Sequence, residues 1–285
     1  MRNDEDPDHP GCLGSLTIAL LLVLSSNAMA QTTIGPGYQA QDGAVAVIIA
    51  GQSNAAGRGS LLPEDKTSAE PGVVVVHNDG RIVPGIEPFD SLPGTGYGRT
   101  LARTLIEAGI APEVWIIQCA VGGTPITNWI GADVTHPFIP PIGLGGIEPK
   151  QLRVAAGSNL YLGCLAQAAI ARHHGIQRFI AVAWHQGEYG CGSPVNSAAQ
   201  FDRLQILTHQ FKTDFPGIAF IGGELARWSG QCAYKSVVDD ATLRASDAFV
   251  SSEGLESKGV HFTRSALREF GTRYAEAILS VINSQ

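Results

Sequence analysis

Residues 44–50 read Ala-Val-Ala-Val-Ile-Ile-Ala, and Gly51-Gln52-Ser53-Asn54 follows directly. A continuous apolar run rich in β-branched residues is typical of a parallel strand that is covered on both faces. A glycine at the exit of such a strand permits a sharp turn. This stretch therefore predicts a central strand that delivers a polar loop to one edge of a sheet.

Further apolar runs alternate with helical patterns along the rest of the chain. The apolar runs predict strands at residues 73–76, 114–118, 179–184 and 218–221, and the helical patterns predict helices at residues 97–109, 159–173, 198–211 and 264–281. Such alternation indicates an α/β fold, a central parallel sheet with helices on both faces. In this class of fold, sites form in the loops beyond the carboxyl ends of the strands.

The composition is ordinary for a globular protein. It has 285 residues, of which 44% are hydrophobic and 16% charged, with a formal net charge of -7. An acidic balance argues against a nucleic-acid partner, which favours a basic face. No linker or internal repeat divides the middle of the chain, so we expect a single domain over residues 31–285.

The first thirty residues differ from the rest. Residues 16–24 form an apolar run that is too short to span a bilayer, and the small-x-small sequence Ala28-Met29-Ala30 follows it. The preceding stretch is acidic, unlike the start of a signal peptide, so a buried N-terminal helix is the alternative. We expect residues 1–30 to be a signal peptide or leader, and the mature protein to be secreted or periplasmic without a membrane anchor.

The five cysteines suggest one disulfide. Cys12 falls in the predicted leader. Cys119 and Cys164 lie in apolar contexts, where we expect buried free thiols. Cys191 and Cys232 lie in glycine-rich loops and are the plausible pair in an oxidising compartment. No cysteine spacing indicates a metal site.

Four loop segments together contain the groups that acyl transfer requires: a nucleophile, backbone donors for an oxyanion, an amide or acid, and a base. Taken singly, each segment has a structural explanation, such as a helix-capping serine, a turn or a core histidine. The segments are Gly51-Gln52-Ser53-Asn54, Ala120-Val121-Gly122-Gly123-Thr124, Trp184-His185-Gln186-Gly187-Glu188 and Gly259-Val260-His261-Phe262.

The order of GQSN, GGT, WHQGE and GVH resembles the SGNH-type hydrolases, in particular the sialate O-acetylesterase-like branch that includes carbohydrate esterase family six. The resemblance runs over nearly all of residues 44–280 and includes Ala56-Gly57-Arg58-Gly59. It implies a flavodoxin-like three-layer α/β/α sandwich and a serine acetylesterase that acts on acetylated carbohydrates without a cofactor.

By position, Ser53 resembles the family nucleophile and His261 the general base. The resemblance assigns the oxyanion hole to the backbone N–H groups of Ser53 and Gly123 and to the side chain of Gln186. Three further residues are expected to shape the turn or to contact the substrate, namely Gln52, Asn54 and His185.

One position departs from the family pattern. The family has an aspartate three residues before the histidine, whereas this chain has Lys258, which cannot accept a hydrogen bond from an imidazole. We favour Glu188 as the acid that supports His261, because a strand end holds a side chain more rigidly than a loop does. The alternatives are Glu256 or Glu253, an unaided dyad, or a catalytically impaired sugar-binding protein.

The sequence says less about the substrate. The loop at residues 130–149 is rich in glycine and proline and is expected to wall the pocket, and Trp129 and Tyr189 are candidates for stacking on a sugar ring. A broader, lipase-like esterase of the same fold is a further alternative. Neither the acetylated sugar nor the oligomeric state is indicated.

Overall fold

The computed structural model describes residues 33–35, 37–90, 93–130, 159–228, 230 and 232–284, all within the unit Gln31–Gln285. The predicted leader at residues 1–30, with Cys12, lies outside the described residues. So does the predicted pocket-wall loop from residue 131 onward.

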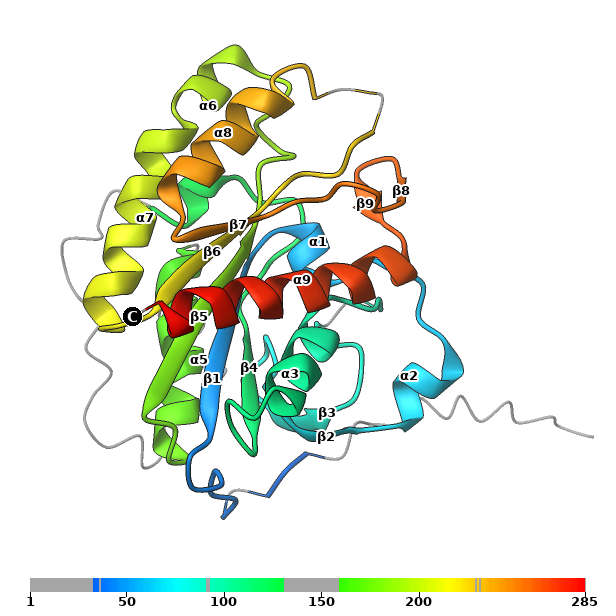
Figure 1. Ribbon diagram of the computed structural model, residues 1–285, viewed down its shortest axis with the longest axis vertical. Coiled ribbons are helices and arrows are strands. Elements are labelled where there is room, and N and C mark those ends of the chain that lie inside the picture. Colours follow the sequence, from blue (N-terminus) through cyan, green and yellow to red (C-terminus); the bar gives the residue numbers. More distant parts are fainter. Residues whose placement is uncertain are drawn as a thin grey trace, which may run out of the picture. The chain divides into compact units, whose positions relative to one another are not determined.

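A seven-stranded sheet forms the middle layer (Figure 1), in the order β3-β2-β4-β1-β5-β6-β7. Every neighbouring pair is parallel except β2 and β3, which are antiparallel at one edge. The predicted, mostly parallel sheet is thus confirmed. The strands are β1 (Val45–Gly51), β2 (Glu70–Val76), β3 (Ile82–Gly85), β4 (Val114–Gln118), β5 (Arg178–His185), β6 (Ala219–Gly223) and β7 (Ala248–Val250).

Strand β1 shows why its sequence is apolar throughout. Val45, Val47 and Ile49 belong to one hydrophobic core, whereas Ala46 and Ile48 belong to the other. Since each fully buried Val or Ile contributes about 1.5–3 kcal/mol, a two-sided strand stabilises both layers at once.

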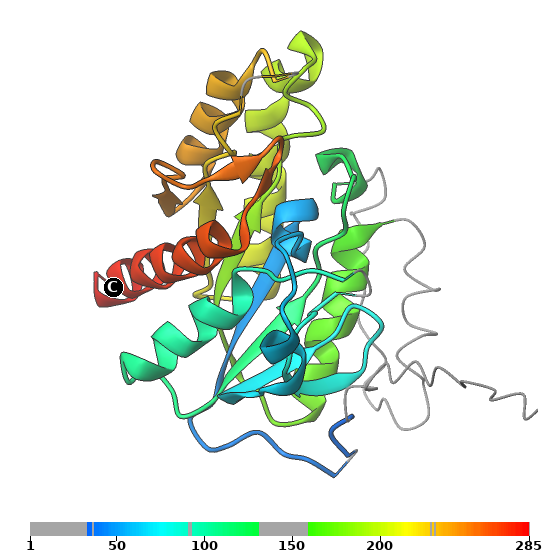
Figure 2. The same cartoon turned by 90° about the vertical axis from the view of Figure 1, so that its right-hand side faces the viewer.

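Helices cover both faces of the sheet. Side chains of α3 (Gly98–Glu107) and α9 (Arg264–Asn283) pack into the core that contains Val45, and those of α5 (Leu160–His173) and α7 (Gln200–Asp214) pack into the opposite core. Figure 2 shows α3 and α9 together on one side of the sheet and α5 on the other. The three-layer α/β/α arrangement predicted from the alternating pattern is therefore present.

Several short elements complete the unit, and the sequence patterns did not predict them. They are α1 (Ser53–Ala56), α2 (Pro63–Thr67), η1 (Ile126–Asn128), α6 (Pro194–Ala198), α8 (Lys235–Ala245) and the hairpin of β8 (Ser257–Lys258) and β9 (His261–Phe262).

Two disulfides form within the described part of the chain. Cys191 and Cys232 are bonded, as the sequence favoured. Cys119 and Cys164 are also bonded, with their Cα atoms 5.1 Å apart, so the expectation of free thiols there was wrong. Their apolar surroundings do signal burial, but a buried half-cystine and a buried thiol have the same sequence context. The bond between Cys119 and Cys164 joins the end of β4 to α5.

The parallel strands β4, β1 and β5 are neighbours, so their carboxyl ends meet at one edge of the sheet. At this edge α1 follows β1, and the β9 segment lies beside α1 (Figure 1). Three of the four predicted site segments follow these strands directly, and the fourth lies in β9. Within the described ranges, no helix is long and apolar enough to cross a membrane.

Candidate active site

The turn after β1 depends on Gly51. Its φ of +127° belongs to a region that side chains rarely adopt, and a Cβ there would lie 2.0 Å from the carbonyl oxygen of His185. The next residue, Gln52, donates its backbone N–H to that same carbonyl at 3.0 Å. Glycine therefore lets the chain turn tightly against β5, and Ser53 becomes the first residue of α1.

Ser53 and His261 meet although 208 residues separate them. The Nε2 atom of His261 lies 3.0 Å from the Oγ atom of Ser53, within range of direct proton transfer. The Ser53 residue is 8% exposed, and His261 is half-buried. The two side chains on which the sequence-based mechanism depends are thus hydrogen-bonded to each other.

The environment favours a neutral imidazole. Burial lowers the pKa of His261 below its ordinary value, the negative charge of Glu188 raises it, and the positive charge of Arg58 lowers it, with a net downward shift. A neutral imidazole can accept a proton, so His261 is in the protonation state of a general base at neutral pH.

A pocket of about 440 Å³ opens over this pair. Two residues that line it are candidate backbone donors. The N–H of Ser53 lies in the first turn of α1, where it has no intrahelical partner, and Gly123 has a φ of +73°. All four predicted segments contribute to the lining, together with Arg58 and Tyr189. The lining residues are Gln52, Ser53, Arg58, Gly122, Gly123, Glu188, Tyr189, Val260 and His261.

Asn54 was expected to shape the turn or to contact the substrate. It is fully buried and does not line the pocket, so the structure does not place it where a substrate would bind. Its Nδ2 atom donates to the carbonyl oxygen of Val260 at 2.9 Å, and its Oδ1 atom accepts the N–H of Phe262 at 3.1 Å. Because these two residues flank His261, Asn54 holds the peptide segment that carries the imidazole.

Gln52 lines the pocket, but His185 does not. His185 is fully buried, its Nε2 atom is 3.1 Å from the carbonyl oxygen of Glu224, and its ring packs against Phe262 and Phe270. The prediction that His185 contacts substrate was therefore wrong. A histidine at a strand end can point into the core or out of the sheet edge, and here it points into the core.

Gln186, the predicted third oxyanion donor, is 1% exposed and lines a neighbouring pocket. Among the described residues its Nε2 atom makes two long contacts, at 3.4 Å to the carbonyl oxygen of Thr124 and at 3.5 Å to Oε1 of Gln52. Its Oε1 atom accepts a hydrogen bond from Gln200 at 3.1 Å, which fixes the side chain from behind. The weakly held amide nitrogen lies beside the pocket that contains Ser53.

Glu188 is the acid that the structure brings into the pocket with His261. Its side chain is 3% exposed, its Oε1 atom accepts a hydrogen bond from Asn54 at 2.8 Å, and the same atom lies 3.4 Å from Nδ1 of His185. Its Oε2 atom is buried and has no hydrogen-bond partner among the described residues. Among the residues that the structure describes, no carboxylate accepts a hydrogen bond from His261. Glu188 therefore acts on the imidazole through its charge.

The other candidate acids are directed to solvent. The side chain of Glu253 is 78% exposed and lies near Arg227, and Glu256 is exposed. Lys258, which stands at the position of the family aspartate, is also exposed and pairs with His261 only through the backbone of the β8–β9 hairpin. The loop before α9 therefore supplies no buried acid.

Arg58 was noted in the sequence only as part of the family resemblance. Its Nη1 atom donates to the carbonyl oxygen of Gly57 at 2.6 Å and pairs with Asp90 at 3.2 Å, and Arg58 lines the pocket that contains Ser53. A single arginine in a loop carries no distinguishing sequence signal, so a structure was needed to place it there.

The two aromatic candidates for sugar stacking separate clearly. Trp129 is fully buried and packs edge-on against Trp184, so the expectation that it meets a sugar was wrong. Tyr189 is 59% exposed and lines the pocket that contains Ser53. Across the ranges that the structure describes, no cluster of three or more His, Cys, Asp or Glu residues is arranged to hold a metal ion.

Comparisons with known proteins agree with this fold. Residues 44–280 match the family described as "Carbohydrate esterase, sialic acid-specific acetylesterase". A solved protein of Arabidopsis thaliana has a similar structure, with a TM-score of 0.65 and 22% identity, covering 83% of this chain and 98% of that one. A carbohydrate acetylesterase from Xanthomonas citri has a TM-score of 0.58 and 17% identity, covering 85% of this chain and 57% of that one. At such identities these likenesses show the fold alone. No curated protein has a significantly similar sequence.

Proposed function

The chain belongs to the sialic acid-specific acetylesterase family of carbohydrate esterases, and from this premise we propose that it hydrolyses O-acetyl esters of carbohydrates by a serine mechanism. The observation that carries the proposal is the 3.0 Å hydrogen bond between Ser53 and His261 at the floor of an open pocket. A serine hydroxyl is a weak nucleophile until a base takes its proton, and His261 is placed to do so.

In the proposed reaction, Ser53 Oγ attacks the acetyl carbonyl while Nε2 of His261 takes the hydroxyl proton. The N–H groups of Ser53 and Gly123 stabilise the oxyanion, with Nε2 of Gln186 as the third donor. Each such donor is worth about 3–4 kcal/mol in the transition state. His261 then returns the proton to the departing sugar hydroxyl. In the second half of the reaction, His261 takes a proton from water, the water oxygen attacks the acetyl-enzyme, and the proton passes to Oγ of Ser53 as acetate leaves.

We assign Glu188 the role of stabilising the imidazolium that forms during attack. Its negative charge raises the pKa of His261, and its buried Oε2 atom lacks a hydrogen-bond partner in the described residues. A negative charge near the imidazole favours its protonated form in the transition state. Lys258 is exposed, and the charges that shift the pKa of His261 are those of Glu188 and Arg58.

Two disulfides support the proposal that the protein is secreted or periplasmic. Disulfides persist in oxidising compartments and are rare in the cytosol of most organisms. The predicted leader over residues 1–30 also supports export of the protein.

The test is acetate release from acetylated xylan and from O-acetylated methyl glycosides, with wild type compared with Ser53→Ala. We expect activity to fall to background in Ser53→Ala and to remain in Ser60→Ala, a matched change at a nearby exposed serine. A fluorophosphonate probe should label wild type and not Ser53→Ala.

Two outcomes would replace the proposal. A folded wild-type protein that neither reacts with the probe nor releases acetate would be a sugar-binding protein that has lost catalysis, the reading that Lys258 favoured in the sequence. Activity that rises with acyl chain length would indicate a broader, lipase-like esterase.

A further inference from the structure

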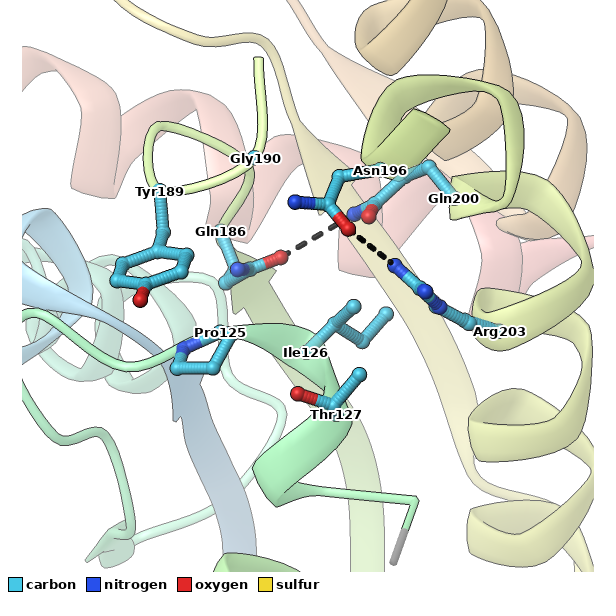
Figure 3. A pocket seen from close by; sticks show the side chains of 9 residues that line it. All are labelled: Pro125, Ile126, Thr127, Gln186, Tyr189, Gly190, Asn196, Gln200 and Arg203. Carbon is cyan, nitrogen blue, oxygen red and sulfur yellow. Dashed lines mark hydrogen bonds between the residues drawn. The ribbon is translucent and has the colours of Figure 1, made fainter. Parts of the chain in front are cut away.

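His185 is a buried histidine that the proposed reaction does not use. Its ring lies at the end of β5 and packs against Phe262 and Phe270, whose ring centroids are 5.7 Å and 5.6 Å away. The next residue, Gln186, lines the neighbouring pocket, where Gln200 binds its side chain (Figure 3). His185 lines neither pocket, so its two ring nitrogens must find their partners inside the protein.

Both ring nitrogens of His185 face acceptors. Nε2 is 3.1 Å from the backbone carbonyl oxygen of Glu224, which has no proton to give, so Nε2 carries one. Nδ1 is 3.4 Å from Oε1 of Glu188 and has no hydrogen-bond partner among the described residues. In a neutral imidazole this nitrogen would direct a lone pair at a carboxylate, although both side chains are at most 3% exposed. A proton on Nδ1 turns this repulsion into attraction.

The surroundings of Glu188 favour an ionised carboxylate. Asn54 donates to Oε1 of Glu188 at 2.8 Å, and its amide is fixed in this orientation because its Oδ1 atom accepts the N–H of Phe262 at 3.1 Å. A hydrogen bond to the charged form of a group stabilises that form. The extra proton of the pair therefore belongs on Nδ1 of His185 rather than on Glu188.

The other titratable groups around the pair do not replace His185 as its cation. Burial raises the pKa of Tyr97 on α3 and of Tyr274 on α9, so both phenols stay neutral. Burial also lowers the pKa of His261 on β9, and Arg58 and the carboxylate of Glu224 have ion pairs of their own. Among the described residues, the one basic side chain within ion-pair distance of Glu188 is that of His185.

We propose that His185 carries protons on both ring nitrogens and, as an imidazolium, is a positioning residue that keeps Glu188 ionised and oriented for its action on His261. The inference rests on the proposed esterase function, in which the charge of Glu188 stabilises the protonated His261. Glu188 lines the pocket with His261 and His185 does not, so the negative member of the pair is the one that faces the reaction.

The first experiment locates the proton by NMR of the ring nitrogens in wild type labelled with nitrogen-15 histidine. At about pH 8 an unpaired histidine is neutral, whereas we expect His185 to keep protons on both ring nitrogens. Its signals should be absent from His185→Asn and present in His209→Gln, a matched change at an exposed histidine of α7. If Nδ1 of His185 carries no proton, the inference is overturned.

The second experiment follows hydrolysis of p-nitrophenyl acetate as a function of pH. His185→Gln can keep the donor to Glu224 but not the one to Glu188, so we expect kcat near neutral pH to fall about tenfold, the loss of a hydrogen bond to a charged group. The acid limb of kcat/KM should move to higher pH, because Glu188 without its cation binds a proton more readily. This direction is opposite to the one expected for Glu188→Gln. His185→Asn, whose amide nitrogen can take the place of Nδ1, should lie between wild type and His185→Gln.

A double variant separates positioning from a purely structural role. If His185 acts through Glu188, His185→Gln/Glu188→Gln should be no slower than Glu188→Gln alone. Losses that multiply in the double variant, or an acid limb that stays in place in His185→Gln, would overturn the assignment. The NMR result does not depend on activity. If wild type hydrolyses no ester but His185 is an imidazolium, the esterase proposal falls and the ion pair stands; if an active enzyme has a neutral His185, the inference alone falls.

Discussion

Replacing Asn54 should damage catalysis although its side chain is shielded from the pocket. Asn54→Ala removes the hydrogen bonds to Val260, Phe262 and Glu188, which hold both peptides that flank His261. The free backbone groups and the carboxylate would then be left without their partner in a buried region. Each orphaned group costs about 1–3 kcal/mol, so we expect a loss of about 3–5 kcal/mol in the free energy of unfolding.

The effect on rate follows from the position of His261. The imidazole is held against Ser53 at 3.0 Å, and a displacement of about 1 Å is enough to reduce the rate about 10²-fold. We therefore expect kcat to fall at least that far. Asn54→Asp keeps the side-chain volume but places an oxygen against both Glu188 and the carbonyl of Val260, so it should be similarly impaired.

The assay is steady-state hydrolysis of p-nitrophenyl acetate, with urea denaturation of each variant followed by circular dichroism. Leu207→Ala on α7 is the matched control, because deleting this fully buried side chain should also lose about 2–5 kcal/mol without reaching His261. Its kcat should match wild type at a temperature where both variants are folded. The positioning role is refuted if kcat of Asn54→Ala stays within about threefold of wild type. It is also refuted if kcat falls no further in Asn54→Ala than in Leu207→Ala.

Three further predictions concern the acid, the base and a disulfide. Glu188→Gln should reduce kcat about 10²-fold and Glu256→Gln less than about twofold; the reverse order would move the acid to the loop before α9. Because burial lowers the pKa of His261, the acid limb of kcat/KM should lie below pH 6.5. The limb should move lower still in Glu188→Gln, which removes the negative charge that raises the pKa of His261. A limb that moves upward in this variant would contradict the assignment. The lowered pKa of His261 also favours proton binding to the unfolded chain, so the contribution of His261 to stability declines as the pH falls below 6.5. The double variant Cys119→Ala/Cys164→Ala opens a loop of 45 residues and should lose about 4 kcal/mol in urea denaturation, and an unchanged midpoint would show that the bond does not stabilise the fold.

The sequence predicted the sheet because its central strands are apolar on both faces. Residues 44–50 needed no partner to be identified, since their composition alone indicates burial on two sides. The edge strand β3 was missed because it has four residues and contains Pro84, which breaks the pattern of a strand. Helix α8 was also missed, although its Val238 and Ala241 are buried against the rest of the protein.

The site was predictable where one segment carries its own chemistry. Ser53 and His261 were found from short motifs and their resemblance to a family. The role of Asn54 was not, because its partners are 134 to 208 residues away and are mostly backbone groups, which leave no mark in the sequence. His185 was misjudged for a related reason: the sequence places it at a strand end but does not say which way its ring turns.

The adjacency of Ser53 and Asn54 on α1 has a mechanical consequence. Ser53 carries the reacting oxygen, and Asn54 is hydrogen-bonded to the β9 strand that carries His261. A shift of this short helix should therefore move Ser53 and His261 in the same direction. We therefore expect the distance between Oγ of Ser53 and Nε2 of His261 to change little when α1 shifts. A designer who transplanted this dyad into another scaffold would have to carry α1 and β9 across as one rigid body.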